Sequence, residues 1–257
     1  MFLAALAVLA VSHAGFDQSH ARWTEVLAAN VHGESVDYKA IQSDRTAFDA
    51  YLASLESVMP EEFASWSRAQ QFAFWIDAYN AFTVKRVVDA YPIASIQDLD
   101  DGTTKVWDQA VVPLGKLFPD AGGNDLSLND IQNRILRPKF KDARVHAAIH
   151  RASRSSPPLL AKAYVADRLD EQLDAQVASW LANPSLNGFD AKADKVVVSK
   201  VFDWFQDDFV RDAGSVRAWI AARAPEKERD WLASAKDVAI EFQAYSWKLD
   251  DHPLRKP

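Results

Sequence analysis

Residues 67–91, SRAQQFAFWIDAYNAFTVKRVVDAY, decide how this chain folds. Ser67 and Gln70 have the spacing of a helix capping box, and a proline follows the stretch, so the sequence predicts one long helix here. Apolar residues occupy most of its faces, which is typical of a helix inside a protein. Asp77 and Asn80 fall side by side on this helix, where buried polar groups need hydrogen-bond partners. We expect both to fasten neighbouring loops, with direct catalysis as the alternative.

The rest of the apolar pattern predicts more helices and a few strands. Helical spacing recurs over residues 20–31, 46–58, 127–137, 167–183 and 215–222. Strands are predicted over 144–149, 195–201 and 238–247, with a hairpin over 111–118. Pro138 is expected to end the helix before it. Helices lead and strands cluster in the middle and at the end, which favours an α+β fold, helix-rich with a small antiparallel sheet.

Composition narrows the class of protein. The chain has 257 residues, of which 49% are hydrophobic and 25% charged, as in ordinary soluble proteins. No change of composition divides residues 15–257, so we expect a single globular domain. The formal net charge of −7 argues against nucleic acid as the main partner, because such binding needs a basic surface. The nine tryptophans should mostly be core, though such an excess would also suit a cleft.

The N-terminus predicts export from the cytoplasm. Residues 2–11, FLAALAVLAV, form an apolar run that is too short to span a bilayer, and small residues follow it. We interpret residues 1–14 as a signal peptide, with a mature chain that begins near Gly15 and is periplasmic or secreted. A buried N-terminal helix is the alternative. No other segment predicts a transmembrane span.

Residues 146–159, HAAIHRASRSSPPL, are the stretch where chemistry is expected. On the predicted strand, His146 and His150 would lie about 13 Å apart, and no carboxylate pair accompanies them, so we predict no metal site. Ser153, Ser155 or Ser156 could be a nucleophile if a histidine lies within reach. The simpler interpretation is a polar turn that leads into Pro-Pro, because the stretch lacks the Gly-x-Ser-x-Gly elbow of many serine hydrolases.

Other reactive patterns are sparse. The chain has no cysteine, which excludes disulfides, thiolate metal sites and cysteine nucleophiles. Asp207 and Asp208 form a carboxylate pair, and Asp98, Asp100 and Asp101 form another cluster; near loops such carboxylates are usually solvated, and residues 100–102 predict a turn. There is no phosphate-binding loop and no dinucleotide fingerprint, and we predict no cofactor.

Five phrases in order resemble a known family. They are FWIDAYNA (74–81), LSLNDIQNRILRPKF (126–140), RVHAAIHRASRSSPPL (144–159), VSKVFDWFQDDF (198–209) and YSWKLD (245–250). Together they are similar to the family called domain of unknown function 547, over residues 23–250. Many members of that family resemble secreted bacterial proteins with leaders like this one.

The resemblance implies that reactive positions have been replaced. The family pattern reads His-Phe-Ala-Val-Asn-Cys and then Cys-Pro-Pro-Leu, which puts His146 at the family histidine, Arg151 at the first cysteine and Ser156 at the second. Family members carry Glu and His where this chain has Gln132 and Asn133. The lost residue types would suit a thiol hydrolase or transferase with a papain- or transglutaminase-like fold.

Three hypotheses remain open. In the first, the chain is a catalytically degenerate member that binds an anionic ligand or a partner protein through Asp77, Asn80, His146, Arg151 and Ser156, with Arg151 as the anion anchor. In the second, it is a hydrolase or acyl transferase with Ser155 or Ser156 as nucleophile and His146 or His150 as base. In the third, it is a structural or interaction protein of the cell envelope. We favour the first.

Overall fold

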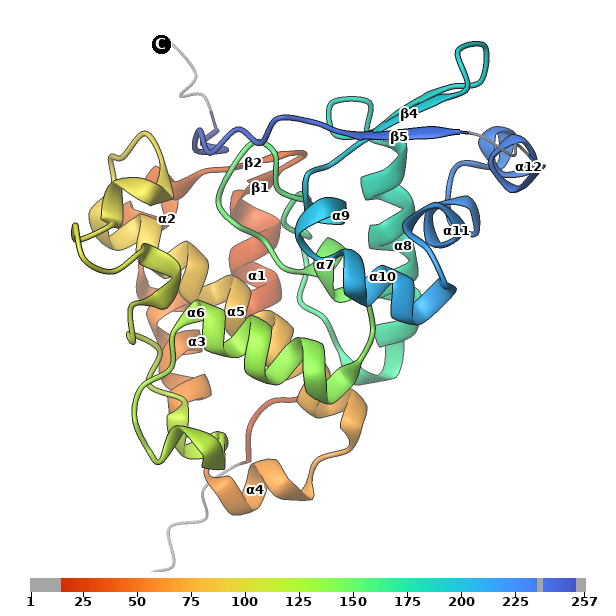
Figure 1. Cartoon of the computed structure of the whole chain (residues 1–257). Helices are drawn as coiled ribbons and strands as arrows, with labels where there is room; N and C mark the ends of the chain where they lie inside the picture. Colours follow the sequence, from red (N-terminus) through yellow and green to blue (C-terminus); the bar gives the residue numbers. More distant parts are fainter. Residues whose placement is uncertain (1–14, 235–237, 253–257) are drawn as a thin grey trace, which may run out of the picture.

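The computed structural model describes residues 15–234 and 238–252, and the predicted signal peptide lies outside them. Helix α5, Arg68–Ala90, runs through the middle of the molecule and is surrounded by other helices (Figure 1). Its predicted capping box is present: Ser67 Oγ accepts from the N–H of Gln70, and the Gln70 side chain accepts from the N–H of Ser67. Apolar side chains on opposite sides of the helix, such as Phe72 and Phe74, are both buried. The prediction of an interior helix is confirmed.

The N-terminal helices pack against one another and against α5. Their bounds are α1 Ala21–Asn30, α2 Tyr38–Ser43, α3 Thr46–Ser57 and α4 Pro60–Ser65, and the paired strands β1 Val31–His32 and β2 Ser35–Val36 separate α1 from α2. Trp23 of α1 stacks on Phe48 and Tyr51 of α3. Helices α1 and α3 confirm the predictions over residues 20–31 and 46–58.

Residues 111–118 do not form the predicted hairpin. Val112 pairs with Leu126 in a single antiparallel bridge, and the chain between them passes through 3₁₀ turns. Pro113 and Pro119 lack the N–H that a ladder of strand hydrogen bonds would need, which explains the difference. The 3₁₀ turns of the described chain are η1 Ile96–Leu99, η2 Val106–Asp108, η3 Gly115–Leu117, η4 Pro119–Ala121 and η6 Ala166–Arg168.

The next helix begins where the sequence predicts and ends later. Helix α6, Leu128–Asp130, starts at the capping box of Ser127 and Asp130 and continues as a π-helix, η5, over Ile131–Phe140. Pro138 therefore does not end it, contrary to the prediction. In an α-helix the proline ring would clash with the carbonyl four residues earlier, and the wider π turn moves that carbonyl aside.

Residues 144–149 form a turn of helix and not the predicted strand. Helix α7 spans Val145–Ala148, and the backbone becomes extended only at Ile149. Arg144 fixes the start of α7 through ion pairs to carboxylates of the preceding loop and of α8, namely Asp142, Asp170 and Asp174. A short apolar run fits a buried helix as well as a buried strand, so its pattern could not distinguish them.

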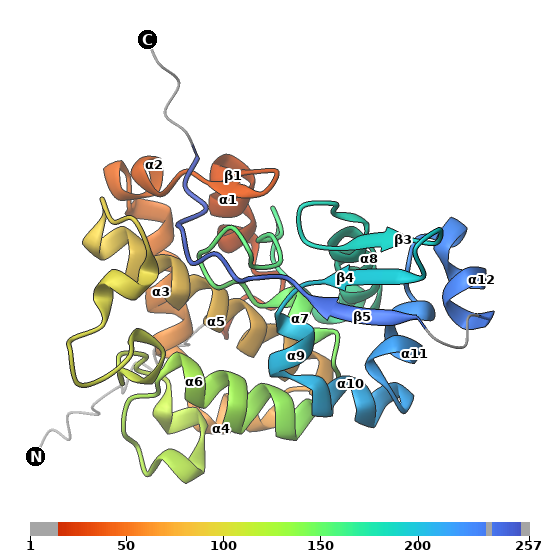
Figure 2. The same cartoon turned by 45° about the horizontal axis from the view of Figure 1, so that its top comes forward.

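The C-terminal half adds a small sheet. Helix α8, Leu169–Ala182, confirms the helix predicted over 167–183, and strands β3 Gly188–Asp190, β4 Lys195–Val198 and β5 Ala239–Phe242 follow (Figure 2). Strand β3 is antiparallel to β4, whereas β5 is parallel to it, so this sheet is mixed and not wholly antiparallel. Helices α9 Val201–Trp204, α10 Gln206–Ala213, α11 Val216–Ala221 and α12 Glu226–Ser234 lie between β4 and β5 in the chain.

Two apolar clusters hold these elements together. The larger cluster surrounds α5, and the smaller one joins α8 to the helices and strands that follow it, around Trp180, Phe202 and Trp219. The fold is α+β and helix-rich with small sheets, as predicted. Within residues 15–234 and 238–252, no helix has both the length and the apolar character needed to cross a membrane.

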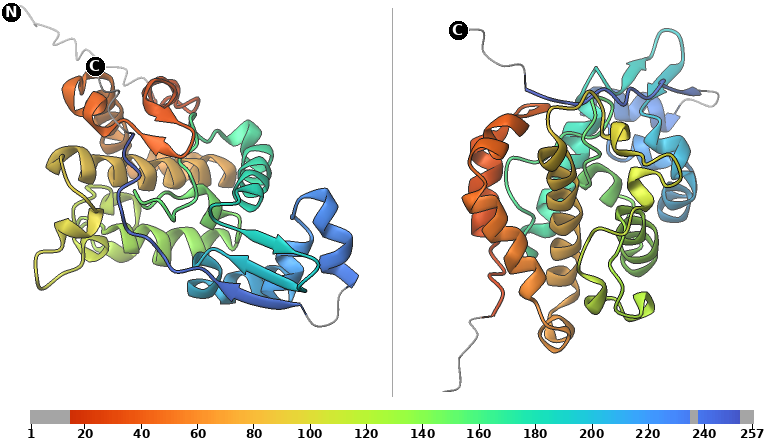
Figure 3. Two further views of the ribbon diagram at one scale, coloured as in Figure 1. Left: turned by 90° about the horizontal axis from the view of Figure 1, so that it is seen from above. Right: turned by 90° about the vertical axis from the view of Figure 1, so that its left-hand side faces the viewer.

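An extended C-terminal segment, residues 243–252, crosses the molecule from the sheet to the N-terminal helices, and we call it the strap (Figure 3). It hydrogen-bonds to four segments that are far apart in sequence: Gln243 N–H to Val198 O, Arg154 N–H to Lys248 O, Leu249 N–H to Ala94 O and His252 N–H to Val36 O. The strand predicted over 238–247 is confirmed only for residues 239–242, because the chain then leaves the sheet.

Gly115 allows a stability test of the corrected 111–126 segment. A Cβ at this buried position would lie 1.6 Å from the backbone oxygen of Asn124, so neither partner could move away cheaply. Gly115→Ala should lower the free energy of unfolding by about 3 kcal/mol in urea denaturation. Gly188→Ala is the control, since its Cβ would meet nothing closer than 3.9 Å. Equal effects of the two substitutions would contradict the described packing.

Candidate functional site

The loop that follows α7 is fastened to the central helix by one side chain. The amide of Asn80 donates to the carbonyl of Ala148 at 2.9 Å and accepts from the N–H of His150 at 2.8 Å. Both bonds are buried, so they satisfy two backbone groups that would otherwise have no partner. The expectation that Asn80 fastens a loop is confirmed, because the nitrogen and the oxygen of its amide each bond to the backbone of this loop.

His150 closes the same loop from its other end. Its Nδ1 lies 3.1 Å from the carbonyl of Pro157, and its Nε2 lies 3.0 Å from Oδ2 of Asp250 in the strap. The hydroxyl of Tyr38 donates to the other oxygen of Asp250 at 2.8 Å. With both ring nitrogens engaged and only 1% of the side chain exposed, His150 acts as a buried structural bridge.

The three serines of the loop bond to groups other than histidine. Ser153 Oγ lies 2.8 Å from the hydroxyl of Tyr245, and Ser155 Oγ accepts from the N–H of Ser246. Ser156 Oγ accepts from the N–H of Arg151 at 2.9 Å. Among the described residues, no hydrogen bond joins any of these serines to His146 or His150, so the pairing that a serine nucleophile needs is not formed here.

His146 lies on α7, fully buried. Its Nε2 is 2.7 Å from Oδ2 of Asp208, its ring stacks on Phe205 at 4.3 Å between centroids, and its Nδ1 has no partner among the described residues. Burial lowers the pKa of His146 to about 4, against the opposing effect of the Asp208 carboxylate. The imidazole is therefore neutral at pH 7, and it acts as an orienting group for the ring of Phe205.

Asp208 is buried, although the sequence favoured a solvated carboxylate. It comes from α10 and receives Arg137 Nε at 2.6 Å and Arg211 Nη1 at 2.7 Å, besides His146. Burial raises the pKa of its carboxyl, but the bonds from His146 and Arg137 outweigh burial and lower it strongly. The sequence pattern could not predict this burial, because Asp208 of α10 is covered through contacts with other elements, such as that with His146 of α7.

Arg151 has the most unusual surroundings of the candidates. Only 4% of the residue is exposed, yet no carboxylate among residues 15–234 and 238–252 forms an ion pair with it. Its Nη1 makes one long hydrogen bond of 3.5 Å to the carbonyl of Ile149, and its guanidinium lies 5.4 Å from the centre of the Phe205 ring. Nη2 has no hydrogen-bond partner in the described chain. A buried cation without a counter-charge costs several kcal/mol unless something else compensates it.

Arg151 opens into a pocket of about 310 Å³. Tyr79 and Gln132 also line it. The rest of the wall consists of four aromatic side chains, Trp107, Trp204, Phe205 and Trp247, and three polar ones, Gln97, Lys105 and Asn129. Burial raises the pKa of the Tyr79 hydroxyl to about 12, although Arg151 opposes this, so the hydroxyl keeps its proton. The sequence did not predict which residues line the pocket, although the excess of tryptophan was noted as suitable for a cleft.

The predicted site residues thus divide into three groups. Arg151 lines the pocket, whereas Asn80, His146 and Ser156 lie behind it and hold its loop or the Phe205 ring. Asp77 belongs to another cluster. Its carboxylate accepts from the N–H of Tyr164 at 3.0 Å and lies 3.2 Å from His20, so it also fastens a loop, as expected.

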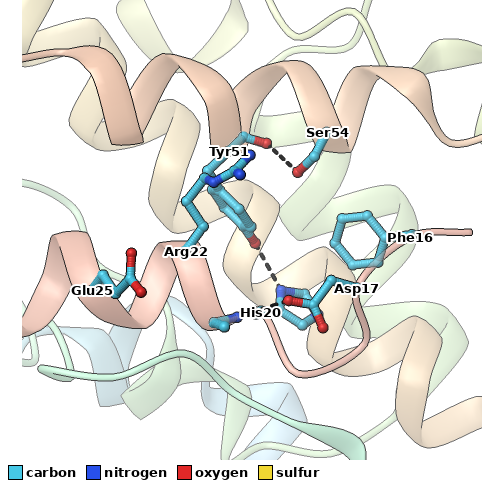
Figure 4. A pocket seen from close by; sticks show the side chains of 8 residues that line it. Phe16, Asp17, His20, Arg22, Glu25, Tyr51 and Ser54 are labelled. Carbon is cyan, nitrogen blue, oxygen red and sulfur yellow. Dashed lines mark hydrogen bonds between the residues drawn. The ribbon is translucent and has the colours of Figure 1, made fainter. Parts of the chain in front are cut away.

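Figure 4 shows the second hollow, of about 270 Å³, beside His20. The loop before α1, the first turns of α1 and helix α3 form it, and Tyr51 meets His20 Nδ1 at 2.8 Å. Burial lowers the pKa of His20 to about 4 and raises that of Asp77 well above its usual range. In the described ranges, no group of three or more histidine or acidic side chains is arranged to hold a metal ion.

The burial of His146 predicts a pH dependence. Unfolded His146 binds a proton below pH 6.5, whereas the folded protein binds it only near pH 4, so stability falls as the pH falls between these values. His146→Gln removes this linkage. The unfolding free energy of the wild type relative to the variant should fall by about 1.4 kcal/mol per pH unit in that window. A difference that stays constant from pH 6.5 to 4 would contradict a neutral, buried His146.

Comparison with known proteins identifies the region that contains the pocket. A family model described as protein of unknown function, DUF547, matches residues 63–181. No curated protein and no solved structure matches the chain. The matched region contains α5, the α6 helix and the loop of Arg151, which are the parts that carry three of the phrases noted in the sequence. Residues 63–181 of this chain, just under half of it, are therefore similar to the DUF547 family, and the chain departs from the family pattern noted above in having no cysteine.

Proposed function

We propose that this protein binds a small anionic ligand at Arg151 and does not catalyse a reaction there. The observation that carries this proposal is the Arg151 guanidinium, which is buried, lacks an ion-pair partner in the described chain and opens into a pocket. A carboxylate or phosphate on the ligand would supply the missing counter-charge. Arginine suits this role, because its planar group donates two parallel hydrogen bonds to either anion.

The charges around the pocket support an anion. Arg137 and Arg211 both bond to Asp208, and Arg211 also pairs with Asp212. The carboxylates of Asp208 and Asp212 are therefore ion-paired with Arg137 and Arg211. The Arg151 charge has no carboxylate partner in the described chain, and its contact with the face of Phe205 is worth about 2 kcal/mol in a desolvated position.

The pocket is also held in place before any ligand arrives. Ser156 Oγ accepts a hydrogen bond from the N–H of Arg151, and the Asn80 side chain bonds to the backbone of Ala148 and His150. The ring of His146 stacks on Phe205. An anchor whose position is already restricted loses less conformational entropy on binding. This favours binding over a purely structural role for the loop.

Loss of the family's reactive groups supports the second half of the proposal. Arg151 and Ser156 stand where the family resemblance puts cysteines, and Ser156 Oγ is occupied by a backbone N–H. A serine hydroxyl needs an aligned base to attack, and His146 is bonded to Asp208 instead. We therefore expect no covalent adduct when the protein is treated with a serine-directed phosphonate and weighed by intact mass spectrometry.

We further propose that the protein acts outside the cytoplasm, periplasmic or secreted. The apolar run over residues 2–11 and the absence of cysteine support this. Phe16, just beyond the expected cleavage point, already packs against Trp66 and Phe74, so cleavage after Ala14 would spare these contacts.

Replacing the anchor should abolish binding without unfolding the protein. Arg151→Gln should weaken the binding of inorganic phosphate or benzoate at least tenfold in isothermal titration, because a charge-assisted hydrogen bond contributes about 1.5–3 kcal/mol. Without ligand, its unfolding free energy should equal or exceed that of the wild type, since an unpaired buried charge is removed. Arg154→Gln is the matched control, in the same loop but exposed, and should bind as the wild type does. The proposal fails if neither anion binds or if both variants lose binding equally.

Export predicts a defined mature N-terminus. Expression of residues 1–257 in a bacterium with a functional secretion system should yield a periplasmic or extracellular protein that begins at Gly15, because the small residues before it suit the signal peptidase. Intact mass and N-terminal sequencing measure this. A cytoplasmic product that retains residues 1–14 would refute the proposed location.

A further inference from the structure

We infer that the ligand is an acidic sugar, a hexuronic acid unit whose carboxylate meets Arg151 and whose ring lies against the tryptophans of the pocket. This inference rests on the proposed function and goes beyond it, because it names the chemical class of the ligand. Three features of the pocket carry it: its flat aromatic wall, its unengaged polar groups and the state of the backbone around it.

The wall offers flat apolar faces at the mouth of the pocket. Trp204 is 41% exposed, stacks on Trp247 with ring planes 18° apart and is one of the few large apolar side chains of the described chain to be so exposed. Trp107 packs on Trp247 from the other side at 5.7 Å. Large apolar side chains that cluster at an exposed surface often mark the place where a ligand or a partner binds. The apolar C–H face of a pyranose ring could pack flat on the Trp204 ring and cover it.

The polar groups near Arg151 indicate that the ligand carries hydrogen-bonding groups besides its negative charge. In the described part of the chain, neither the amide of Gln132, which is 4% exposed, nor the hydroxyl of Tyr79 has a hydrogen-bond partner. Both can donate and accept, as the hydroxyls of a sugar can. A fatty acid or an aromatic acid would bury these groups without partners, at about 1–3 kcal/mol for each.

The backbone around the pocket argues against a peptide ligand. Peptides are commonly held by main-chain bonds to a free strand edge. The strap beside the pocket has no continuous free edge, because the N–H of Ser246, the carbonyl of Lys248 and the N–H of Leu249 are bonded within the chain. The pocket is lined by side chains from separate elements and not by a strand edge, and its size suits one or two sugar rings.

The test compares five probes by isothermal titration: D-galacturonate, D-glucuronate, D-galactose, benzoate and the peptide N-acetyl-Gly-Trp. At least one uronate should bind ten or more times as tightly as benzoate, and galactose should bind at least thirtyfold more weakly than that uronate because it lacks the charge. Gln132→Met should weaken uronate binding at least fivefold and leave benzoate within twofold. Trp204→Ala, at a residue that is 41% exposed, should weaken the binding of both uronates, because it removes the ring face that the sugar would cover.

The outcomes separate this inference from the proposed function. Met59→Ala, another exposed apolar side chain, is the control for Trp204→Ala and should bind every probe as the wild type does. If benzoate binds in an Arg151-dependent way but uronates bind no tighter, the inference is wrong and the proposed function stands. Tenfold tighter binding of the peptide than of either uronate also overturns the inference. If no anionic probe binds, both fail.

Discussion

The double hydrogen bond between Asn80 and the backbone around Ile149 is the constraint on which the pocket depends. It joins the central helix to the end of α7 through the carbonyl of Ala148 and the N–H of His150, and Arg151 follows directly after the bonded His150. A buried amide that satisfies one donor and one acceptor on the same short segment fixes both the position and the direction of that segment. The Ser156 and His150 bonds then close the loop on itself, so the guanidinium has little freedom.

A second constraint is electrostatic. Asp208 gathers His146, Arg137 and Arg211 around one carboxylate, and this set packs against Phe205 and Phe209. In the described chain that carboxylate forms no ion pair with Arg151, although Arg137 and Arg151 both lie over the Phe205 ring. One arginine beside the ring is therefore compensated by a carboxylate and the other is not. An uncompensated arginine is costly in an empty core but useful beside a pocket that receives an anion.

Much of the fold could be predicted from the sequence, and the errors share a cause. Long amphipathic or apolar segments with caps, such as residues 67–91, were predicted correctly because periodicity and capping agree over many residues. The errors at 111–118, 138 and 144–149 concern short segments, where the packing of other elements decides between helix and strand. Of the site, Arg151 was identified from the family resemblance. Trp107, Trp204, Trp247 and Tyr79 come from four separate segments, and no local pattern shows that they meet.

The strap has a consequence for how the protein matures. Trp247 belongs to the wall of the pocket, and Asp250 accepts a hydrogen bond from Tyr38 and lies 3.0 Å from His150 of the Arg151 loop, yet both follow every other part of the pocket in the chain. Helices α1 to α8 emerge from the ribosome before them and can pack around α5 while the pocket still lacks one side. The nascent chain therefore becomes competent to recognise a ligand only after residues 243–252 have been made and have packed across the surface.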